Sequence, residues 1–129
     1  MEESPWDIIG DALTAYNTQM AEADAGQNLC FVLKSAEDEI VGGLIGATYW
    51  DWHYINLMWV RDDLRGPGYG RQLLQLAEKE ARRRGAEKAY LDTFNFQAPA
   101  FYKSLGYQEF GRLEDFPAGH TRYFPTKPL

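Results

Sequence analysis

The first third of the chain changes from a helical to a strand-like pattern of hydrophobic positions. Ser4, Pro5 and Asp7 suit a helix start, because serine caps the first turn, proline fits the first helical position and an acidic residue three positions after the serine completes a capping box. Apolar side chains then recur at the spacing of one helix face, at Ile9, Leu13, Tyr16 and Met20. The pattern predicts a helix that ends near Ala25–Gly26.

Three strands are predicted after this helix. Runs of β-branched, aromatic and leucine side chains place them at residues 28–35, 40–50 and 53–60. A polar turn separates the first two strands. Gly42, Gly43 and Gly46 lie inside the second, which suggests a bulge or a close approach of the backbone there.

The remaining chain alternates between helices and strands. Residues 70–85 predict an amphipathic helix that ends at Gly85 and has one apolar face, formed by Leu73, Leu76, Ala77 and Ala81. The later elements are a strand at 88–94, a short helix that Pro99 starts, and strands at 107–113 and 121–126. A strand meander followed by a crossover helix predicts an α+β fold, with one mixed sheet and helices on both of its faces. We expect the 129 residues to form a single domain, 1–129.

Composition and charge narrow the classes of partner. The formal net charge of −6 repels nucleic-acid phosphates, and the basic run Arg82–Arg84 lies in the last turn of a predicted helix, where cations are favoured. No apolar run is long enough to span a bilayer and no signal-peptide pattern is present, so we expect a cytoplasmic protein that binds neither nucleic acid nor membranes. The single cysteine, Cys30, excludes an internal disulfide, and its apolar strand predicts that it is buried.

A glycine-rich segment, Arg65-Gly66-Pro67-Gly68-Tyr69-Gly70, stands between the third strand and the amphipathic helix. The first N–H groups of a helix have no partner within it, and the helix dipole adds about half a positive charge, so this position favours a phosphate. The segment lacks the Gly-Lys-Ser/Thr end of a Walker A loop and has the wrong spacing and place for a dinucleotide fingerprint. A tight turn that binds nothing is the structural alternative.

The segment and the residues that follow it resemble the GNAT superfamily of acetyl-CoA-dependent N-acetyltransferases over about residues 29–125, and short bacterial members in particular. The similarity rests on Val60, Arg65-x-x-Gly68-x-Gly70, Asn95-x-x-Ala98-x-x-x-Tyr102 and Leu105-Gly106-Tyr107. The resemblance implies the acyltransferase fold of that superfamily. Its usual first strand is absent or reduced here, because a helix begins within the first few residues, and the loss would expose a sheet edge or favour a homodimer that covers it.

The resemblance also implies how acetyl-CoA would bind, with no metal ion involved. Backbone N–H groups of the glycine-rich loop would face the pyrophosphate, and the third strand would splay from the strand at 88–94 to hold the pantetheine arm. The N–H near Met58 would polarise the thioester carbonyl. The cofactor-binding residues implied in this way are Met58, Trp59, Val60, Arg65, Gly66, Gly68, Tyr69, Gly70, Arg71, Asn95, Ala98 and Tyr102.

Two catalytic positions follow from the same resemblance, Tyr102 and Asn56. Tyr102 stands where the family often places the acid that assists the departing CoA thiolate, and packing of the short helix is its alternative role. The position of Asn56 is often glutamate in the short bacterial members, and asparagine cannot act as a general base. Asn56 therefore holds a water relay, or catalysis is weak, or another group serves as base. The other groups considered are His53, Asp92, Glu114 and His120.

The acceptor is expected to be the primary amine of a small molecule, attacked directly in a ternary complex. Candidate contacts are Trp52, Tyr54, Asp92 and His120, because aromatic faces and carboxylates attract organic cations. Core packing also explains the aromatic cluster, which consists of Tyr49, Trp50, Trp52, Tyr54 and Trp59. The alternatives are a CoA-binding module with weak or no catalysis, and an acetyltransferase for peptides or proteins.

Overall fold

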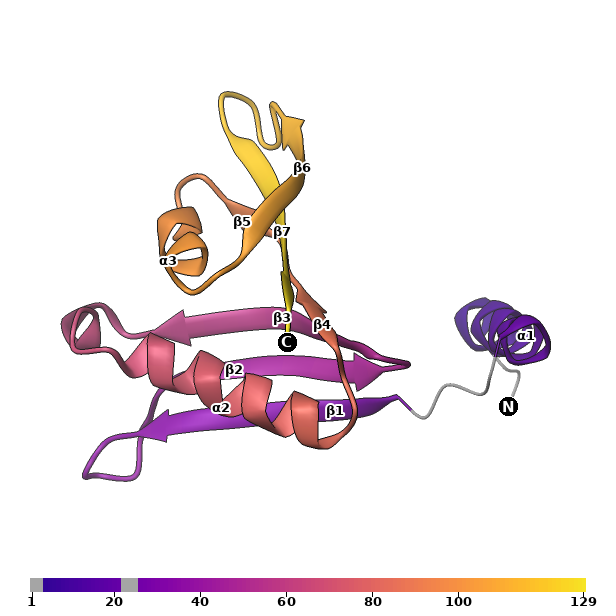
Figure 1. Cartoon of the computed structure of the whole chain (residues 1–129), viewed down its shortest axis with the longest axis horizontal. Helices are drawn as coiled ribbons and strands as arrows, with labels where there is room; N and C mark the ends of the chain where they lie inside the picture. The colour runs from indigo at the N-terminus through magenta and orange to yellow at the C-terminus, as the bar shows by residue number, and fades with distance from the viewer. Residues whose placement is uncertain (1–3, 22–25) are drawn as a thin grey trace.

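A computed structural model describes residues 4–21 and 26–129 of the chain. In chain order the elements are α1 (Pro5–Met20), β1 (Gln27–Lys34), β2 (Ile40–Tyr49), β3 (Trp52–Val60), the 3-10 helix η1 (Asp62–Leu64), α2 (Tyr69–Arg83), β4 (Lys88–Tyr90), β5 (Thr93–Phe94), α3 (Pro99–Ser104), β6 (Gln108–Glu114) and β7 (Thr121–Pro128). Within these residues seven strands form one mixed sheet in the order β1-β2-β3-β4-β7-β5, with β6 paired to β7 (Figure 1). The predicted mixed sheet is confirmed, and no described residue forms a strand ahead of α1.

Helix α2 packs against one face of the antiparallel strands β1, β2 and β3. Its buried side chains meet the inward-facing residues Leu29, Leu44 and Ile55 in a single hydrophobic cluster. The apolar face of α2 was predicted to include Leu76, but that side chain is half exposed and Leu74 is fully buried instead. The cluster fixes the direction of α2, so that the N-terminus of the helix lies beside the end of β3.

The sheet opens where β3 and β4 stop pairing. The two strands are parallel neighbours only between Trp52–Tyr54 and Lys88–Tyr90, and they diverge beyond that point (Figure 1). The strand predicted at 88–94 is therefore divided, because β5 pairs with β7 rather than continuing beside β3. The predicted splay is confirmed, and no described strand pairs with Ile55–Val60 on this side of β3.

A bulge interrupts β3 at Asn56. Ile45 of β2 faces Leu57 while Gly46 faces Ile55, so Asn56 is an additional residue on β3. Gly46 allows the close approach of the two strands here, because a Cβ atom at this position would lie 2.3 Å from the carbonyl oxygen of Tyr54. The glycines of the second strand thus mark both the bulge and the close approach that the sequence predicts.

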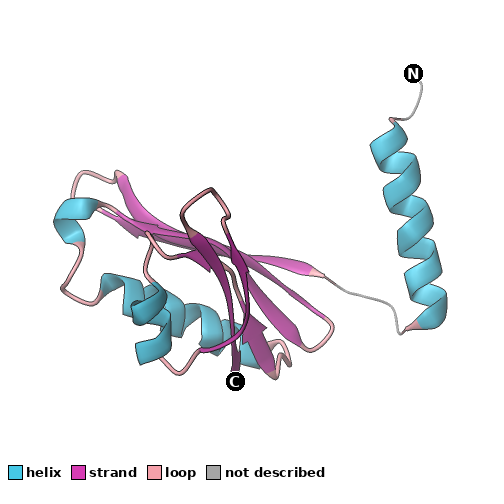
Figure 2. Cartoon of the chain, turned by 90° about the horizontal axis from the view of Figure 1, so that it is seen from above, coloured by secondary structure: helices cyan, strands magenta, loops and turns pink. Residues whose placement is uncertain are grey.

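Helix α1 lies apart from the sheet in both cartoon views (Figures 1 and 2). Its start is as predicted, since the Ser4 hydroxyl accepts a hydrogen bond from the Asp7 N–H at 3.2 Å. Its predicted end near Ala25–Gly26 is wrong, because Ala21 is already extended; Ala25 itself lies outside the described residues. No residue of α1 is buried, so its apolar face does not pack on this chain's own sheet.

The face of β1, β2 and β3 opposite α2 is therefore uncovered in the single chain. Cys30 lies on it and is exposed, which corrects the prediction that this cysteine is buried. Strand alternation gives the reason, since the neighbouring Leu29 and Phe31 point to the α2 side and Cys30 points the other way.

Candidate active site

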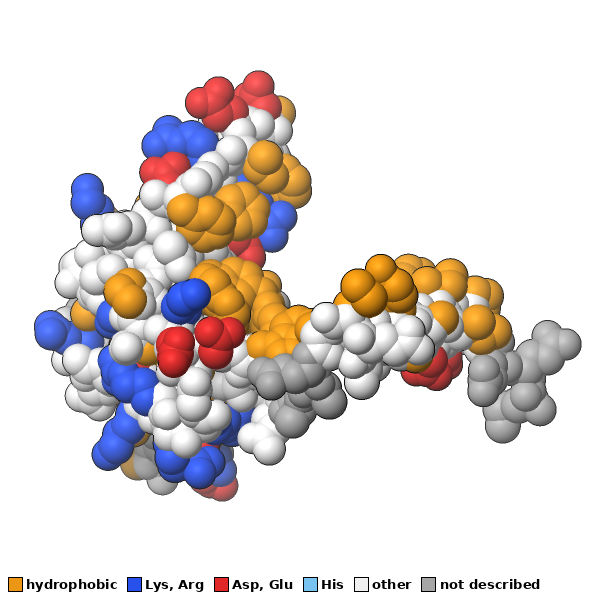
Figure 3. All heavy atoms as spheres, turned by 45° about the vertical axis from the view of Figure 1, so that its right-hand side comes forward, with side chains coloured by type: hydrophobic (Ala, Val, Ile, Leu, Met, Phe, Trp, Pro, Cys, Tyr) orange, Lys and Arg blue, Asp and Glu red, His pale blue; other side chains and the backbone are white. Residues whose placement is uncertain are grey.

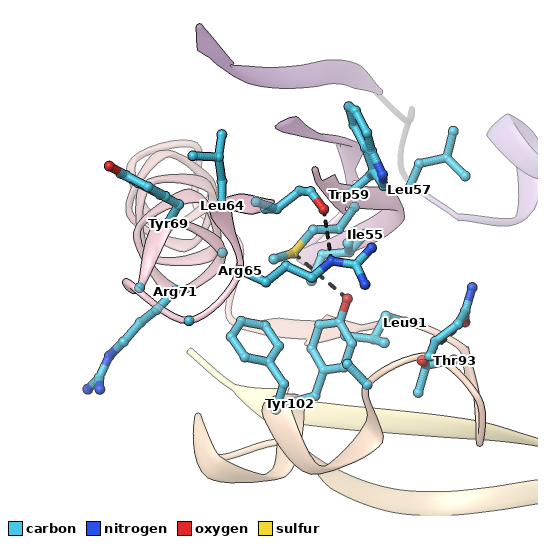
Figure 4. A pocket seen from close by; sticks show the side chains of 18 of the residues that line it. Ile55, Leu57, Trp59, Leu64, Arg65, Tyr69, Arg71, Leu91, Thr93 and Tyr102 are labelled. Carbon is cyan, nitrogen blue, oxygen red and sulfur yellow. Dashed lines mark hydrogen bonds between the residues drawn. The ribbon is translucent and has the colours of Figure 1, made fainter. Parts of the chain in front are cut away.

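A cleft of about 690 Å³ opens between β3, the start of α2 and the chain from Leu91 to Tyr102 (Figure 4). This volume lies in the range of small-molecule binding sites. The cleft is lined by most of the residues that the resemblance implies for the cofactor: Met58, Trp59, Val60, Arg65, Gly66, Gly68, Tyr69, Gly70, Arg71, Ala98 and Tyr102. Asn95 is the exception, because its side-chain oxygen accepts a hydrogen bond from the Thr121 N–H at 2.9 Å and ties the chain after β5 to β7.

The N-terminus of α2 forms an anion-binding cradle at one end of the cleft. The N–H groups of Tyr69, Gly70 and Arg71 have no acceptor within the helix, and Gly68 caps the helix without a side chain. Gly66 and Gly68 have φ angles of 106° and 98°, which disfavour other residues. A Cβ atom on either would meet no other atom within 4 Å, so open space lies in front of the helix start.

Two further contacts shape this end of the cleft. Gly70 is closely packed, since a Cβ atom there would lie 3.1 Å from the Met58 methyl carbon and 3.5 Å from the Phe101 ring. The Arg65 guanidinium donates from Nε to the Val60 carbonyl oxygen at 2.9 Å and pairs with Asp62 at 3.0 Å. The cradle thus combines unpaired N–H groups with a fixed cation, which fits a pyrophosphate group.

Tyr102 projects from α3 into the middle of the cleft (Figure 4). It is 9% exposed, and its hydroxyl lies 3.8 Å from the sulfur of Met58. Burial, followed by the nearby Asp92 carboxylate, raises the pKa of Tyr102 to about 12. The phenol therefore stays protonated at neutral pH and can donate a hydrogen bond to a group between it and β3.

The four groups considered as general base differ sharply in position. His53 is fully buried on the α2 side of the sheet, and Glu114 and His120 are exposed outside the cleft lining. Asp92 does line the cleft, and it is the only acidic residue among the described residues that do so. Asn56 lines the cleft as well, at the bulge, where its amide can donate and accept hydrogen bonds but cannot take up a proton.

Asp92 is held by a cation on the neighbouring strand. The Arg122 guanidinium contacts its Oδ2 atom from Nε at 2.8 Å and from Nη2 at 2.6 Å. Burial and then the Asp92 charge raise the pKa of Tyr54, whose hydroxyl hydrogen-bonds with that carboxylate. Asp92 is thus oriented by two side chains that the sequence separates widely from it, at the rim between β3 and β5.

The other predicted substrate contacts are not brought into the cleft lining. Tyr54 stacks on Tyr90 at 4.8 Å between ring centroids, and Trp52 meets the same ring edge-on at 5.6 Å. His120 lies with its ring edge-to-face against Phe96. The aromatic cluster therefore serves mainly packing, and Trp59 is its only member among the lining residues that the structure describes.

Several lining residues were not predicted from the sequence. They are Ile55, Leu57, Leu64, Leu91, Thr93, Phe96, Gln97 and Phe101. Phe96, Gln97 and Phe101 fall inside the segment from Asn95 to Tyr102, and their position in that motif is the sequence signal that could have identified them. Gln97 fixes the backbone there, because its side-chain oxygen accepts a hydrogen bond from the Phe94 N–H at 2.9 Å.

Buried His53 makes the stability of the fold pH-dependent. Burial lowers its pKa from 6.5 to about 4, and neither ring nitrogen has a hydrogen-bond partner. Between these values the unfolded chain binds more protons than the folded one, so stability is full above pH 6.5 and falls toward pH 4. The shift corresponds to about 3 kcal/mol.

Urea denaturation at pH 7, 5.5 and 4.5 measures this effect. The free energy of unfolding should fall more on acidification for the wild type than for His53→Leu, because the leucine variant lacks the buried imidazole. His120→Gln, which alters the exposed histidine, is the matched control and should follow the wild type. An identical pH dependence in His53→Leu and wild type would contradict the assignment.

Two kinds of feature are absent from the described residues. No group of three or more metal-ligating side chains comes together among them. None of their helices has the length and apolar character needed to cross a membrane.

Comparison with known proteins places the chain in a family. The model of the acetyltransferase (GNAT) family matches residues 2–107. The chain is 36% identical to acetyltransferase Atu2258 of Agrobacterium fabrum, over 88% of this chain and 82% of that protein. It is 38% identical to blasticidin-S acetyltransferase of Streptomyces morookaense, over 70% and 68% of the two chains. The crystal structure of an acetyltransferase from Bacillus cereus superposes with a TM-score of 0.92 at 35% identity, over 100% of this chain and 96% of that one. The chain belongs to the GNAT acetyltransferase family.

Proposed function

We propose that this enzyme transfers the acetyl group of acetyl-CoA to a primary amine of a small cationic molecule. Transfer occurs by direct attack, with both substrates bound together. The observation that carries the proposal is the arrangement of one cleft, in which the anion-binding start of α2, the unpaired side of β3 and Tyr102 lie in sequence. The similarity to blasticidin-S acetyltransferase supports a small-molecule acceptor.

The residues of the cleft fit acetyl-CoA, which supplies an activated acetyl thioester. The N–H groups of Tyr69, Gly70 and Arg71 receive its pyrophosphate in the open space before Gly68. No strand among the described residues pairs with the backbone between Ile55 and Val60 on the cleft side, so these groups can bind an extended arm as an added strand would bind. This binding would complete the part of the sheet that the splay leaves open.

Tyr102 stabilises the leaving sulfur by donating a hydrogen bond from its phenol. With a pKa of about 12, the phenol is a weaker acid than a thiol with an ordinary pKa of about 8.5. Complete proton transfer from Tyr102 to the thiolate is therefore uphill in the free enzyme. The expected role is stabilisation of charge on the sulfur as the carbon–sulfur bond breaks, with the proton supplied by solvent or by the amine.

Asp92 attracts the protonated acceptor and accepts a proton from its nitrogen as the nitrogen–carbon bond forms, when that nitrogen becomes strongly acidic. An amine with a pKa near 10.4 is protonated at neutral pH and cannot attack until it loses a proton. Asp92 is the only acidic residue among the described residues that line the cleft, so it provides both a counter-charge and a proton acceptor there. Asn56 lines the cleft at the bulge, and this supports a role in holding the water or the amine between β3 and that carboxylate.

The direct test is release of free thiol from acetyl-CoA in the presence of an acceptor panel. The panel contains blasticidin S, short diamines, basic peptides and the alcohols that match the diamines. We expect release with small amines and none with the alcohols, because an alcohol has no cationic form and its neutral hydroxyl is a much weaker nucleophile than an amine. Release with peptides alone would instead identify a peptide acetyltransferase. Thermal stabilisation by CoA without release for any acceptor would identify a CoA-binding module.

A further inference from the structure

The single chain exposes two apolar surfaces that do not touch each other. The first, the helix stripe, follows one side of α1 and consists of Trp6, Ile9, Leu13, Tyr16 and Met20. The second, the bare sheet face, lies opposite α2 and consists of Cys30, Val32, Ile45, Leu57 and Trp59. Figure 3 shows hydrophobic side chains along the projecting helix. Exposed apolar patches of this extent are characteristic of protein–protein contacts.

The bare sheet face has a shape on which a helix can pack. Its residues lie in two adjacent rows across the strands, because Cys30 pairs with Ile45 and Ile45 with Leu57, while Val32 pairs with Gly43 and Gly43 with Trp59. Gly43 has no side chain, so the second row is low in its middle between Val32 and Trp59. An amphipathic helix can lay one apolar stripe across such a surface.

The helix stripe is not seated on its own sheet. No residue of α1 is buried, and α1 stands beside the sheet rather than over it (Figures 1 and 2). The superposition on the Bacillus cereus acetyltransferase covers 100% of this chain with a TM-score of 0.92.

We propose that α1 of one copy packs its stripe onto the bare sheet face of a second copy, in a two-fold exchange. A helix held away from its own body leaves its stripe in water unless another molecule covers it, and a second copy carries the matching surface. The exchange is reciprocal, so both stripes and both sheet faces are buried together.

The bare sheet face, on which the exchanged helix would pack, adjoins the active site. Leu57 and Trp59 belong to the bare sheet face and also line the cleft, on the side away from Tyr102 (Figure 4). The α1 helix of the second copy would therefore form a wall of the cleft that the single chain lacks. The exchange thus links assembly to binding of the acceptor, without contributing to the anion-binding cradle.

Native Cys30 makes this contact measurable, because it is the single cysteine of the chain and lies on the bare sheet face. Ile9→Cys, Leu13→Cys and Tyr16→Cys place a second thiol along the stripe, and Thr18→Cys places one on the opposite side of α1 as the matched control. A disulfide forms only where the two Cβ atoms approach to about 4 Å, so three positions are tested along the stripe. Each variant is oxidised and compared on reducing and non-reducing gels.

We expect a disulfide-linked species of twice 14.8 kDa from at least one stripe variant and not from Thr18→Cys. Sedimentation equilibrium of the wild type should give the same doubled mass, and Leu13→Glu should shift it to monomer while Thr18→Glu does not. Leu13 is exposed in the single chain, so its substitution leaves the chain's own packing intact. A disulfide within one chain, a monomeric wild type, or a dimer without a stripe-specific link would overturn the proposal. These measurements need no substrate, so they stand apart from the proposed acetyl transfer.

Discussion

Replacing Tyr102 by phenylalanine is expected to lower kcat by about 10²- to 10³-fold, the loss typical of removing one positioned hydrogen-bond donor. The hydroxyl contacts the Met58 sulfur at 3.8 Å and lies in the middle of the cleft, so its removal affects the leaving sulfur. It makes no strong bond within the fold, and the melting temperature should therefore change little. Steady-state rates with saturating acetyl-CoA and the best amine of the panel measure the effect.

Tyr69→Phe is the matched control for Tyr102→Phe. Tyr69 also lines the cleft, but it lies at the helix start rather than beside Met58, so loss of its hydroxyl should leave kcat near the wild-type value. The pH profile gives a second check. Because the pKa of Tyr102 is raised to about 12, wild-type activity should not decline through ionisation of this tyrosine below about pH 11. Full activity in Tyr102→Phe would refute the assigned role.

Asp92→Asn is expected to lower kcat/KM for the amine by about 10²-fold, because the variant loses both the counter-charge and the proton acceptor. Asparagine keeps the size of the side chain, and Asp92 lies far from the α2 cradle along the cleft, so CoA affinity should be retained. The rate of the variant should recover as the pH rises toward the pKa of the amine, since the free base then reaches the cleft unaided. Initial rates over pH 6.5–10 and the Kd of CoA separate these effects.

Arg122→Gln tests whether Asp92 acts through its charge or only through its ion pair. Both substitutions remove the ion pair, whose contacts are 2.6–2.8 Å long, but Arg122→Gln keeps the carboxylate in the cleft. We expect Arg122→Gln to retain much more activity than Asp92→Asn. Equal losses in the two variants would show that the ion pair is structural and that the proton leaves by another route.

The helices, the strands of the meander and the anion-binding loop were predictable because each depends on local pattern. Ser4 caps α1, the apolar period defines α2, and the glycines at 66 and 68 have the positive φ angles that only glycine accepts readily. These features need no knowledge of distant residues. The same holds for the cleft position of Tyr102, which follows from its spacing to the loop once the resemblance is noticed.

The remaining parts of the site depend on pairings that the sequence does not reveal. Asp92 and Arg122 are thirty residues apart and meet because β5 pairs with β7. Only Lys88–Tyr90 of the strand predicted at 88–94 pair with β3, whereas β7 runs beside both Lys88–Tyr90 and Thr93–Phe94. The exposure of Cys30 and of the helix stripe could not be predicted either. An apolar pattern marks a face that favours burial, but it does not tell whether the same chain or another molecule packs on that face.

Strand β3 contains one residue more than its register with β2 requires. This additional residue determines where β3 can lose a residue without disturbing the hydrophobic core. Along an uninterrupted strand, side chains alternate between the two faces, so residues three apart point in opposite directions. Ile55 and Met58 are three apart and both pack toward α2, because the bulge at Asn56 resets the alternation. A chain that lost Asn56 would keep Met58 and Val60 facing inward, whereas a loss elsewhere in β3 would turn the following side chains over. Position 56 is thus where β3 can lose a residue while the hydrophobic core keeps its composition.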